Sequence, residues 1–353
     1  MNSNNKSCIQ KNLLRWFKKN GRDLPWRKTR DPYRIWVSEI MLQQTQVKTV
    51  IPYYQKFLKT FPTVRHLAKA DLSKVLALWE GLGYYSRARN LHKASREVLN
   101  RFKGKIPDHL NDLLRLPGIG RYTAGAILSI AFNQEAPILD GNAKRVLSRL
   151  YAISNDPGRN ETEALLWRLS ESLVPENHAS FFNQALMDLG ATICSPKAPR
   201  CVFCPLIHLC EAKARGDSER YPTRVVKKRI PRFHAVGAVI QKDGKVLLNH
   251  RPPNGLLGGL WEFPNWPREG KKDLERHLTK KAKREMGITV KSKGPIGLFQ
   301  QTFSHFKLSL HAYRFQAYGK KENGKWIPVQ KLHLFPMSRI HRRIANSLQD
   351  RSS

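Results

Sequence analysis

The chain has 353 residues, and 63 Lys and Arg against 27 Asp and Glu give it a formal net charge of +36. Its 41% hydrophobic residues can build packed cores, which excludes a globally disordered chain. No apolar run reaches the roughly 18 residues of a membrane span, and the first ten residues lack the apolar core of a secretory signal. We therefore expect a cytoplasmic protein, nucleoid-associated if bacterial, that binds no membrane and keeps its cysteines reduced.

The positive charge is spread along the whole chain. Residues 1–220 carry 35 basic and 19 acidic side chains, and residues 221–353 carry 28 and 8. A charge this far from neutrality favours a polyanionic partner, and nucleic acid is the partner we expect unless the basic surface serves only solubility. An anionic membrane surface is the weaker alternative, because no basic amphipathic helix is apparent.

The first part of the chain, residues 1–215, is predicted to be an all-α module. From residue 10 onward apolar residues recur at the spacing of a helix, and Pro and Gly residues separate the stretches. The predicted helical stretches are 35–57, 72–78, 88–99, 110–114, 123–131, 143–153, 161–173 and 181–189.

The pattern changes after residues 216–231, a basic connector without apolar periodicity that we interpret as a linker. Residues 232–353 are predicted to form a smaller domain of the α/β or α+β class. It opens with two strands joined by a tight turn at Asp243-Gly244. The predicted elements are strands over 234–241, over 245–249 and within 302–315, and a polar helix over 273–286.

Four of the five cysteines lie within 17 residues, in the pattern Cys194-x6-Cys201-x2-Cys204-x5-Cys210. Thiolates gathered this closely in a reduced compartment indicate a soft metal centre. Zinc sites usually split their ligands between two short knuckles, whereas one compact loop holds all four here. The spacing therefore favours an iron–sulfur cluster over zinc. No flavin or nicotinamide motif accompanies the loop, so we expect a structural role for the cluster.

A glycine hairpin, Leu116-Pro117-Gly118-Ile119-Gly120, lies between two predicted helices. Gly118 and Gly120 permit a tight turn and a close approach of the backbone. The N–H groups that begin the next helix would form an anion site suited to a DNA phosphate. By itself the pattern fits an ordinary helix–helix turn equally well. The charge and the cysteine loop favour phosphate binding.

Together these motifs resemble the helix–hairpin–helix DNA glycosylases of the endonuclease III superfamily, which also place an Asp where Asp140 follows Gly120 by twenty residues. Three further segments are similar to the MutY adenine DNA glycosylases, and the likeness runs from about residue 16 to about residue 315. These segments are 36–45 (WVSEIMLQQT), 81–85 (GLGYY) and 303–305 (FSH).

The resemblance implies an all-α helix–hairpin–helix glycosylase module with a 4Fe–4S loop, followed by an α/β Nudix-like domain. It also implies a monofunctional enzyme of base excision repair, acting as a monomer on double-stranded DNA. The enzyme would excise adenine mispaired with 8-oxoguanine, and with guanine. Under the same resemblance, Cys194, Cys201, Cys204 and Cys210 hold the cluster.

Cleaving the bond between the sugar C1′ and adenine N9 needs an acid on the base, at N7, and an anion near an oxocarbenium-like sugar, as in glycoside cleavage. The resemblance assigns the acid to Glu39, whose apolar neighbours would raise its pKa by burying it. It assigns the anion to Asp140, whose ionised form a helix N-terminus would favour. Asn142 would orient Asp140.

Tyr122 stands directly after the hairpin, in the position where bifunctional relatives carry a Lys that forms a Schiff base. Because Tyr cannot form one, the residue argues for a monofunctional enzyme, with its hydroxyl expected to bond to Asp140. Arg27 matches a family residue near the adenine, although it could equally contact a phosphate.

An extruded base leaves a gap in the duplex that the protein must fill. The resemblance assigns this wedge to Tyr84, and we expect one residue of the pair Tyr84-Tyr85 to pack in a core. Further contacts to DNA or to the lesion are expected from Gln44, Thr45, Leu82, Gly118, Gly120, Ser304 and His305.

The second domain resembles the Nudix-like recognition domain of the family over residues 254–264. Nudix hydrolases hold Mg²⁺ on glutamates that follow an Arg-Glu pair, but here Arg284-Glu285 is followed by Met286-Gly287 and the further glutamates are missing. A reading domain is therefore favoured over a hydrolase, with Ser304 and His305 sensing N7–H and the 8-oxo edge of the damaged base.

Two other functions stay open at the level of sequence. One is an endonuclease III-like bifunctional glycosylase and lyase on oxidised pyrimidines, against which Tyr122 and the second domain speak. The other is a non-enzymatic iron–sulfur DNA-binding regulator, which would not need the paired carboxylates Glu39 and Asp140.

Overall fold

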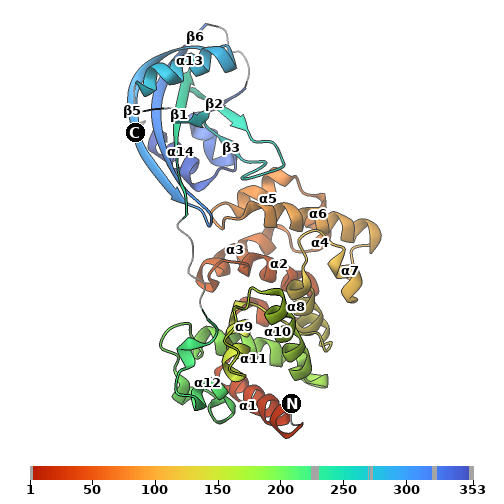
Figure 1. Cartoon of the computed structure of the whole chain (residues 1–353). Helices are drawn as coiled ribbons and strands as arrows, with labels where there is room; N and C mark the ends of the chain where they lie inside the picture. Colours follow the sequence, from red (N-terminus) through yellow and green to blue (C-terminus); the bar gives the residue numbers. More distant parts are fainter. Residues whose placement is uncertain (1–2, 224–229, 269, 271–272, 320–323, 350–353) are drawn as a thin grey trace. The chain divides into compact units, whose positions relative to one another are not determined.

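The computed structural model describes residues 3–223, 230–268, 270, 273–319 and 324–349 (Figure 1). The chain divides into two compact units. The first unit comprises Met1–Lys69 and Asn90–Val226, and the second comprises Ala70–Arg89 and Lys227–Ser353. Residues 224–229 of the predicted linker lie outside the described residues.

The regular elements described in the first unit are all helices, as the sequence predicts. The main deviation is the stretch predicted over 35–57, which forms two helices because Gln44 lies between them with a left-handed φ of 55°. The helices are α1 (Ser3–Asn20), α2 (Pro32–Leu42), α3 (Val47–Thr60), α4 (Val64–Lys69), α6 (Tyr85–Arg101, which begins in the second unit), α7 (Leu110–Leu114), α8 (Arg121–Phe132), α9 (Gly141–Leu150), α10 (Asn160–Leu173), α11 (Ala179–Thr192) and α12 (Glu211–Ala214).

Helix α2 is the buried centre of the first unit. Asp31 caps its N-terminus by accepting hydrogen bonds from the backbone N–H groups of Tyr33 and Arg34, and Pro32 occupies the first turn. Every residue from 33 to 41 except Arg34 is buried, and the helix packs against α3 and α8. A helix enclosed on all sides buries its polar residues as well, and this is what places Glu39 in the interior.

The predicted glycine hairpin joins α7 to α8. Gly118 has a φ of 80°, and a Cβ added to it would lie 2.7 Å from the Cβ of Asn90. Both the backbone conformation and the close packing therefore require glycine at position 118. Gly120 is the N-cap residue of α8, with extended backbone and no side-chain cap.

The second unit is built on a mixed sheet. Its path is β3-β2-β1-β6-β5, with β4 added to β1 and β7 added to β2; β1 and β6 run parallel and the other pairs are antiparallel. The strands are β1 (Arg232–Lys242), β2 (Lys245–His250), β3 (Trp261–Glu262), β4 (Asn265–Pro267), β5 (Thr289–Thr302), β6 (Lys307–Tyr318) and β7 (Lys325–Pro328).

Two helices cover the two faces of this sheet, which confirms the predicted α/β class. Successive residues of β1 alternate between the faces: Val236 packs with α13 (Leu274–Met286), and Ala235 packs with α14 (Arg339–Gln349). The predicted turn at Asp243-Gly244 is confirmed, with left-handed φ angles of 49° and 69°. The sequence missed most of β5, because its lysines, glycines and register shifts hide the alternation.

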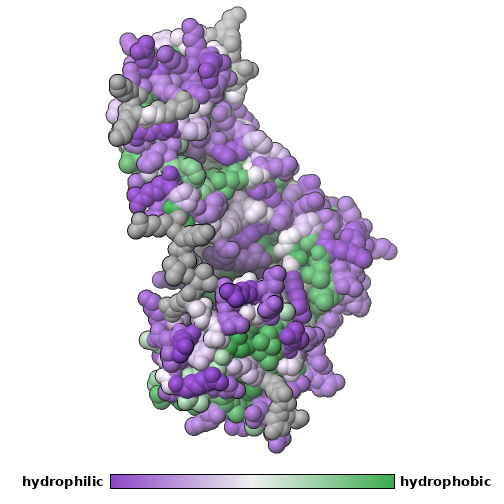
Figure 2. Space-filling view, in the orientation of Figure 1, coloured by the Kyte–Doolittle hydropathy of each residue, from purple (hydrophilic) through white to green (hydrophobic). Residues whose placement is uncertain are grey.

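The second unit also contains α5 (Leu72–Trp79) and the start of α6, which precede the sheet by more than 140 residues in the sequence. Within this unit the Tyr85 hydroxyl donates a hydrogen bond to the backbone oxygen of Met337. The face drawn in Figure 2 is mainly hydrophilic, with separate apolar patches, as expected of a strongly charged chain. Among the described residues no helix combines the length and the apolar character needed to cross a bilayer.

Candidate active site

Glu39 lies on the buried helix α2 with only 3% of its surface exposed. Burial is the main cause that raises its pKa to about 7, with a further increase from the nearby charge of Asp140. A hydrogen bond from the Tyr122 hydroxyl and the charge of Arg27 act in the opposite direction. The carboxyl group is therefore poised to hold or release a proton near neutral pH.

Asp140 is the N-cap residue of α9. One of its carboxylate oxygens accepts a hydrogen bond of 2.7 Å from the Ala143 N–H, and the other accepts one of 3.0 Å from the Asn142 amide. The N–H groups at the helix N-terminus favour its ionised form, as predicted, but burial has the larger effect. Burial raises the pKa of Asp140 above its ordinary value, against the lowering effect of the bonds from Ala143 and Asn142 and of the Arg145 charge.

Tyr122 forms a hydrogen bond to Glu39 instead of the predicted bond to Asp140. Its hydroxyl donates to Oε2 of Glu39 at 2.7 Å, and lies 3.4 Å from the Met187 sulfur; the expected bond to Asp140 is not the one formed. Burial first, and then the charges of Glu39 and Asp140, raise the pKa of Tyr122. The phenol therefore stays a neutral donor to Glu39.

Arg27 lines a narrow pocket together with Glu39 and Met187. Its guanidinium forms a bidentate ion pair with Asp188, with distances of 2.6 and 2.7 Å. Arg22 binds the same carboxylate, so Asp188 receives two arginines at a fully buried position. Because both Nη atoms of Arg27 are bonded to Asp188, the structure speaks against the alternative that Arg27 contacts a DNA phosphate.

Sequence reasoning missed Asp188, although an acidic residue within the apolar pattern of a predicted helix was the available signal. Burial would raise its pKa, but the hydrogen bonds and charge of Arg27, followed by the bonds from Arg22, lower the pKa below its ordinary value. Asp188 is therefore a buried anion that holds Arg27 against the wall of the Glu39 pocket.

A second group connects Asp140 to the cysteine loop. Arg145 donates to the Asn142 side-chain oxygen at 2.9 Å and to the backbone oxygen of Cys194 at 2.7 Å. Helices α9 and α11 can approach each other closely at Asn142 because residue 190 is glycine: a Cβ at Gly190 would lie 2.6 Å from the Cβ of Asn142. The structure thus supports the orienting bond from Asn142 to Asp140 and shows what holds Asn142.

The four clustered cysteines are all partly buried around the segment between α11 and α12. Burial, and then the neighbouring Cys194, Cys210 and Cys201, raise the pKa of Cys204 to about 12, so the four thiols lie within electrostatic reach of one another. The buried Arg149 donates to the Cys194 sulfur at 3.3 Å and to the backbone oxygen of Ser195 at 2.7 Å. Within the described ranges no group of three or more His, Cys, Asp or Glu that could hold a metal ion is present.

The predicted DNA contacts of the first unit lie at turns. Gln44 is exposed and Thr45 is half-buried in the turn between α2 and α3. Gly118 and Gly120 lie in the hairpin before α8. These positions are surface loops, where binding groups commonly reside.

In the second unit, Tyr84 is 42% exposed and has a left-handed φ of 46°. Tyr85 is buried, so the prediction that one residue of the pair packs in a core is confirmed. Leu82, which was predicted to contact DNA, is also buried. Tyr84 is therefore the side chain of this turn that is available to a partner.

Ser304 and His305 form the exposed tip of the hairpin between β5 and β6. The turn is closed by a hydrogen bond from the Phe303 N–H to the Phe306 oxygen, and these two rings stack with centroids 4.4 Å apart. Ser304 Oγ lies 3.1 Å from Nδ1 of His305. The stacked rings thus form a rigid base for two exposed polar side chains.

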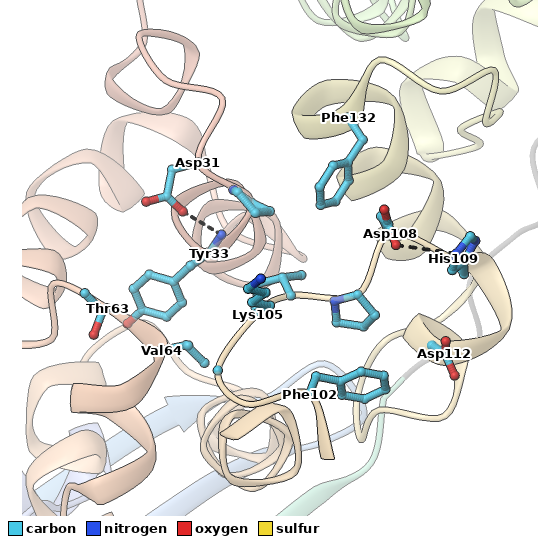
Figure 3. Close-up of a pocket in the computed structure, with 14 residues that line it drawn as sticks. Asp31, Tyr33, Thr63, Val64, Phe102, Lys105, Asp108, His109, Asp112 and Phe132 are labelled. Atoms are coloured by element: carbon cyan, nitrogen blue, oxygen red, sulfur yellow. Dashed lines mark hydrogen bonds and ion pairs between the residues drawn. The ribbon is translucent and has the colours of Figure 1, made fainter. Parts of the chain in front are cut away.

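Figure 3 shows a different pocket of the first unit, whose lining includes Asp31, Tyr33, Phe102, Asp108 and Phe132. It contains none of the predicted site residues. Its acidic residues have local partners: Asp31 caps α2, and Asp108 lies 3.7 Å from the ring of His109. This pocket therefore offers no alternative to the predicted site residues.

Two family models match the chain: the HhH-GPD superfamily base excision DNA repair protein over residues 37–172, and the NUDIX domain over residues 235–347. The chain is 40% identical to the adenine DNA glycosylase of Buchnera aphidicola subsp. Acyrthosiphon pisum (strain APS), over 85% of this chain and 84% of that protein. It is 35% identical to the adenine DNA glycosylase of Homo sapiens, over 96% of this chain and 73% of that protein.

Among solved structures, a thermostable thymine-DNA glycosylase is similar with a TM-score of 0.56 and 32% identity, over 60% of this chain and 98% of that chain. This likeness supports the helical module, and the NUDIX match supports the second domain. The chain therefore belongs to the adenine DNA glycosylase family.

Proposed function

We propose that this protein is a monofunctional DNA glycosylase of base excision repair, which removes adenine mispaired with 8-oxoguanine or guanine. The observation that carries the proposal is the pairing of Glu39, a buried carboxyl group with a pKa of about 7, with Asp140, a second carboxylate close enough to influence it. Family membership supports adenine as the leaving base.

Glu39 is the general acid of the proposed reaction. A carboxyl group with a pKa near 7 is half protonated at neutral pH, so it can protonate adenine N7 and afterwards accept a proton from water. Protonation makes adenine a better leaving group, and the bond from C1′ to N9 then breaks with its electrons moving to the base. Tyr122 holds the Glu39 carboxyl group in place.

Asp140 stabilises the positive charge that develops on the sugar, with Asn142 and the Ala143 N–H fixing its two oxygens. Tyr122 supplies no amine for a Schiff base, which supports base release without cleavage of the strand. Arg27, held by Asp188, completes the wall of the base pocket.

DNA is held and inspected by the turns of both units. Gly118 and Gly120 bring backbone N–H groups toward a phosphate, and Gln44 and Thr45 add polar contacts. Tyr84, the exposed side chain of its turn, fills the gap left by the extruded base. Ser304 and His305 read 8-oxoguanine from the hairpin of the Nudix-like domain.

We propose that Cys194, Cys201, Cys204 and Cys210 hold a 4Fe–4S cluster. Four thiols from one loop, with a buried arginine donating to one sulfur, suit an anionic iron–thiolate centre. When bound, such a cluster supplies iron–thiolate bonds that fix the loop. Arg145 donates to the Cys194 oxygen and so ties the loop to α9, the helix that Asp140 caps.

As a functional division we propose residues 1–215 for the chemistry, 216–231 as a linker and 232–353 for recognition of 8-oxoguanine. We further propose that the protein works as a monomer on chromosomal DNA in the cytoplasm. The net charge of +36 would support salt-sensitive, non-specific sliding along DNA in the search for rare lesions.

The decisive experiment is single-turnover release of adenine from a duplex that pairs adenine with 8-oxoguanine, with an adenine:thymine duplex for comparison. Glu39→Gln should reduce the rate by at least about 100-fold, because it removes the acid. Glu171→Gln is the matched control, since this carboxylate is exposed in the same unit. Full activity of Glu39→Gln would contradict the acid assignment.

Two further readouts test the remaining parts. A gel run without alkali should show intact strands after base release, and scission at the rate of base release would contradict the monofunctional assignment. Analysis for iron and sulfide, together with visible absorption, tests the cluster; a protein with zinc alone and no absorption would refute it.

A further inference from the structure

The turn that carries Tyr84 is held from inside by its neighbours. Trp79 donates its ring N–H to the backbone oxygen of Gly83 at 3.1 Å, and Arg87 donates to the backbone oxygens of Leu82 and Gly83. The Arg87 guanidinium also lies 5.6 Å from the centre of the Tyr84 ring. These contacts fix the shape of the turn.

The same turn is anchored to the C-terminal domain through Glu80, the residue directly before it. The Glu80 carboxylate accepts hydrogen bonds from Arg342 Nε at 2.5 Å and Nη2 at 3.0 Å, and from the Met337 N–H at 3.1 Å. On the other side of the turn, the Tyr85 hydroxyl donates to the Met337 oxygen. Both ends of the turn are therefore bonded to the segment that leads into α14.

Arg342 is a rigid partner. Its remaining donors bind the backbone oxygens of Leu332 at 3.0 Å and Phe335 at 2.7 Å. The side chains of Arg342 and Glu80 are only 21% and 19% exposed, so solvent screens this bidentate pair less than an ordinary surface pair. The pair can therefore transmit a displacement of α14 to the turn.

The opposite end of this connection is the hairpin of Ser304 and His305. The first residues of α14 bind the end of β5, directly before that hairpin: the Ile340 N–H donates to the Gln301 side-chain oxygen at 3.0 Å, and Arg343 donates to the Gln300 oxygen at 3.2 Å. A continuous series of hydrogen bonds thus runs from the end of β5, through α14, to Glu80.

We propose that α14 is a strut that couples recognition of the damaged base at Ser304 and His305 to insertion of Tyr84, with Glu80 and Arg342 as its positioning residues. This inference rests on the proposed function. Binding of 8-oxoguanine at the hairpin would fix the β5 end against α14, and α14 would hold the Tyr84 turn in the inserting geometry. Rejection of an undamaged guanine would leave the turn without that support.

The test measures single-turnover adenine release opposite 8-oxoguanine and opposite guanine, and takes the ratio of the two rates. Glu80→Gln keeps an acceptor for the Met337 N–H but removes the charge, and Arg342→Met removes the guanidinium. Both should reduce the ratio by about five- to tenfold. Glu285→Gln is the matched control, because Glu285 is ion-paired with Lys281 on α13 of the same unit. This control should leave the ratio unchanged.

A double-mutant cycle separates coupling from simple loss of stability. Ser304→Ala should reduce the rate opposite 8-oxoguanine by a factor that is about fivefold smaller in the Glu80→Gln background than in the unmodified protein. If the two effects multiply independently, the strut is wrong. Thermal unfolding identifies a variant that fails to fold. If Arg342→Met fails to fold, the isosteric Glu80→Gln still tests the proposal.

A fluorescence measurement needs no catalysis. 2-Aminopurine beside 8-oxoguanine in an uncleaved duplex reports the stacking of Tyr84, with Tyr84→Ala as the reference for its loss. Glu80→Gln should lose the response that depends on Tyr84, whereas Glu285→Gln should keep it. An unchanged response in both Glu80→Gln and Arg342→Met would overturn the strut. Failure of the unmodified protein to release adenine would instead refute the proposed function.

Discussion

The two units of this protein treat their key polar side chains in opposite ways. The first unit encloses Glu39 and Asp140, and burial raises the pKa of both. The second unit exposes Tyr84, Ser304 and His305 on tight turns whose flanking residues are held by hydrogen bonds. Chemistry on a base needs an acid whose pKa is set by exclusion of water, whereas inspection of a duplex needs groups that reach the surface without losing their orientation.

The comparison also explains why the supporting residues differ. In the first unit the supports are charged and buried, such as Asp188 behind Arg27, because they set both the position and the charge of the pocket. In the second unit the supports fix the shape of the exposed turns: ring stacking lies beneath Ser304 and His305, and hydrogen bonds to backbone oxygens and the Glu80–Arg342 ion pair hold the Tyr84 turn. Substitutions in the two units should therefore affect different measurable quantities.

The largest effect is expected for Asp140→Asn. The amide cannot balance the charge of an oxocarbenium-like sugar, so single-turnover adenine release should fall by at least about 100-fold opposite both 8-oxoguanine and guanine. Affinity for the duplex, measured by fluorescence anisotropy, should change little. A rate within about threefold of the unmodified protein would show that the anion is not needed.

The next effect concerns the second unit alone. Ser304→Ala combined with His305→Ala removes the polar groups of the hairpin tip, and the preference for 8-oxoguanine over guanine should fall by about tenfold, as expected for one or two lost hydrogen bonds. Adenine release opposite guanine is the internal control and should stay nearly unchanged. An equal loss with both duplexes would mean that the hairpin serves general affinity rather than reading.

A smaller effect, with a defined direction, is expected for Tyr122→Phe. The Tyr122 hydroxyl stabilises ionised Glu39, so its removal should raise the pKa of Glu39 above about 7. Glu39 would then stay protonated to higher pH. The alkaline limb of the pH–rate profile should therefore shift to higher pH, while the maximal rate falls a few-fold. A limb that moves downward would contradict the assigned hydrogen bond.

The smallest expected effect concerns the pH dependence of stability, which should differ between the two units. The raised pKa of Glu39 stabilises the first unit at low pH, and this contribution is lost as pH rises from about 4.5 through about 7. In the second unit, burial and then the Arg251 charge lower the pKa of His341 to about 3. The neutral ring therefore contributes to the stability of the fold above about pH 6.5, and this contribution is lost as the pH falls from there through about 3.

The difference in free energy of unfolding between Glu39→Gln and the unmodified protein should therefore shift in favour of the variant when the pH is raised from 5 to 8. The shift should reach up to roughly 3 kcal/mol if the whole change of the pKa contributes. Thermal unfolding at several pH values checks this, with the exposed Glu171→Gln as control. An identical pH dependence in the variant and in the unmodified protein would show that Glu39 does not titrate as the structure indicates.

Local patterns in the sequence predicted much of this architecture. Helical periodicity predicted the core of most helices, the Asp243-Gly244 turn predicted the first hairpin, and Asp140 stands before a predicted helix that it caps. The cysteine spacing and the glycine hairpin were equally visible. Each of these signals depends on residues close together in the chain, because backbone conformation and capping are local preferences.

Only the tertiary structure decided which partners these residues have. Tyr122 bonds to Glu39 rather than Asp140, Arg27 is held by Asp188, 161 positions away, and Glu80 binds Arg342, 262 positions away. The pKa of Glu39 likewise depends on the helices that enclose α2. Burial and ion pairing arise from packing between distant segments, so residue type and spacing indicate which groups are available, and packing sets their charge, partners and reach.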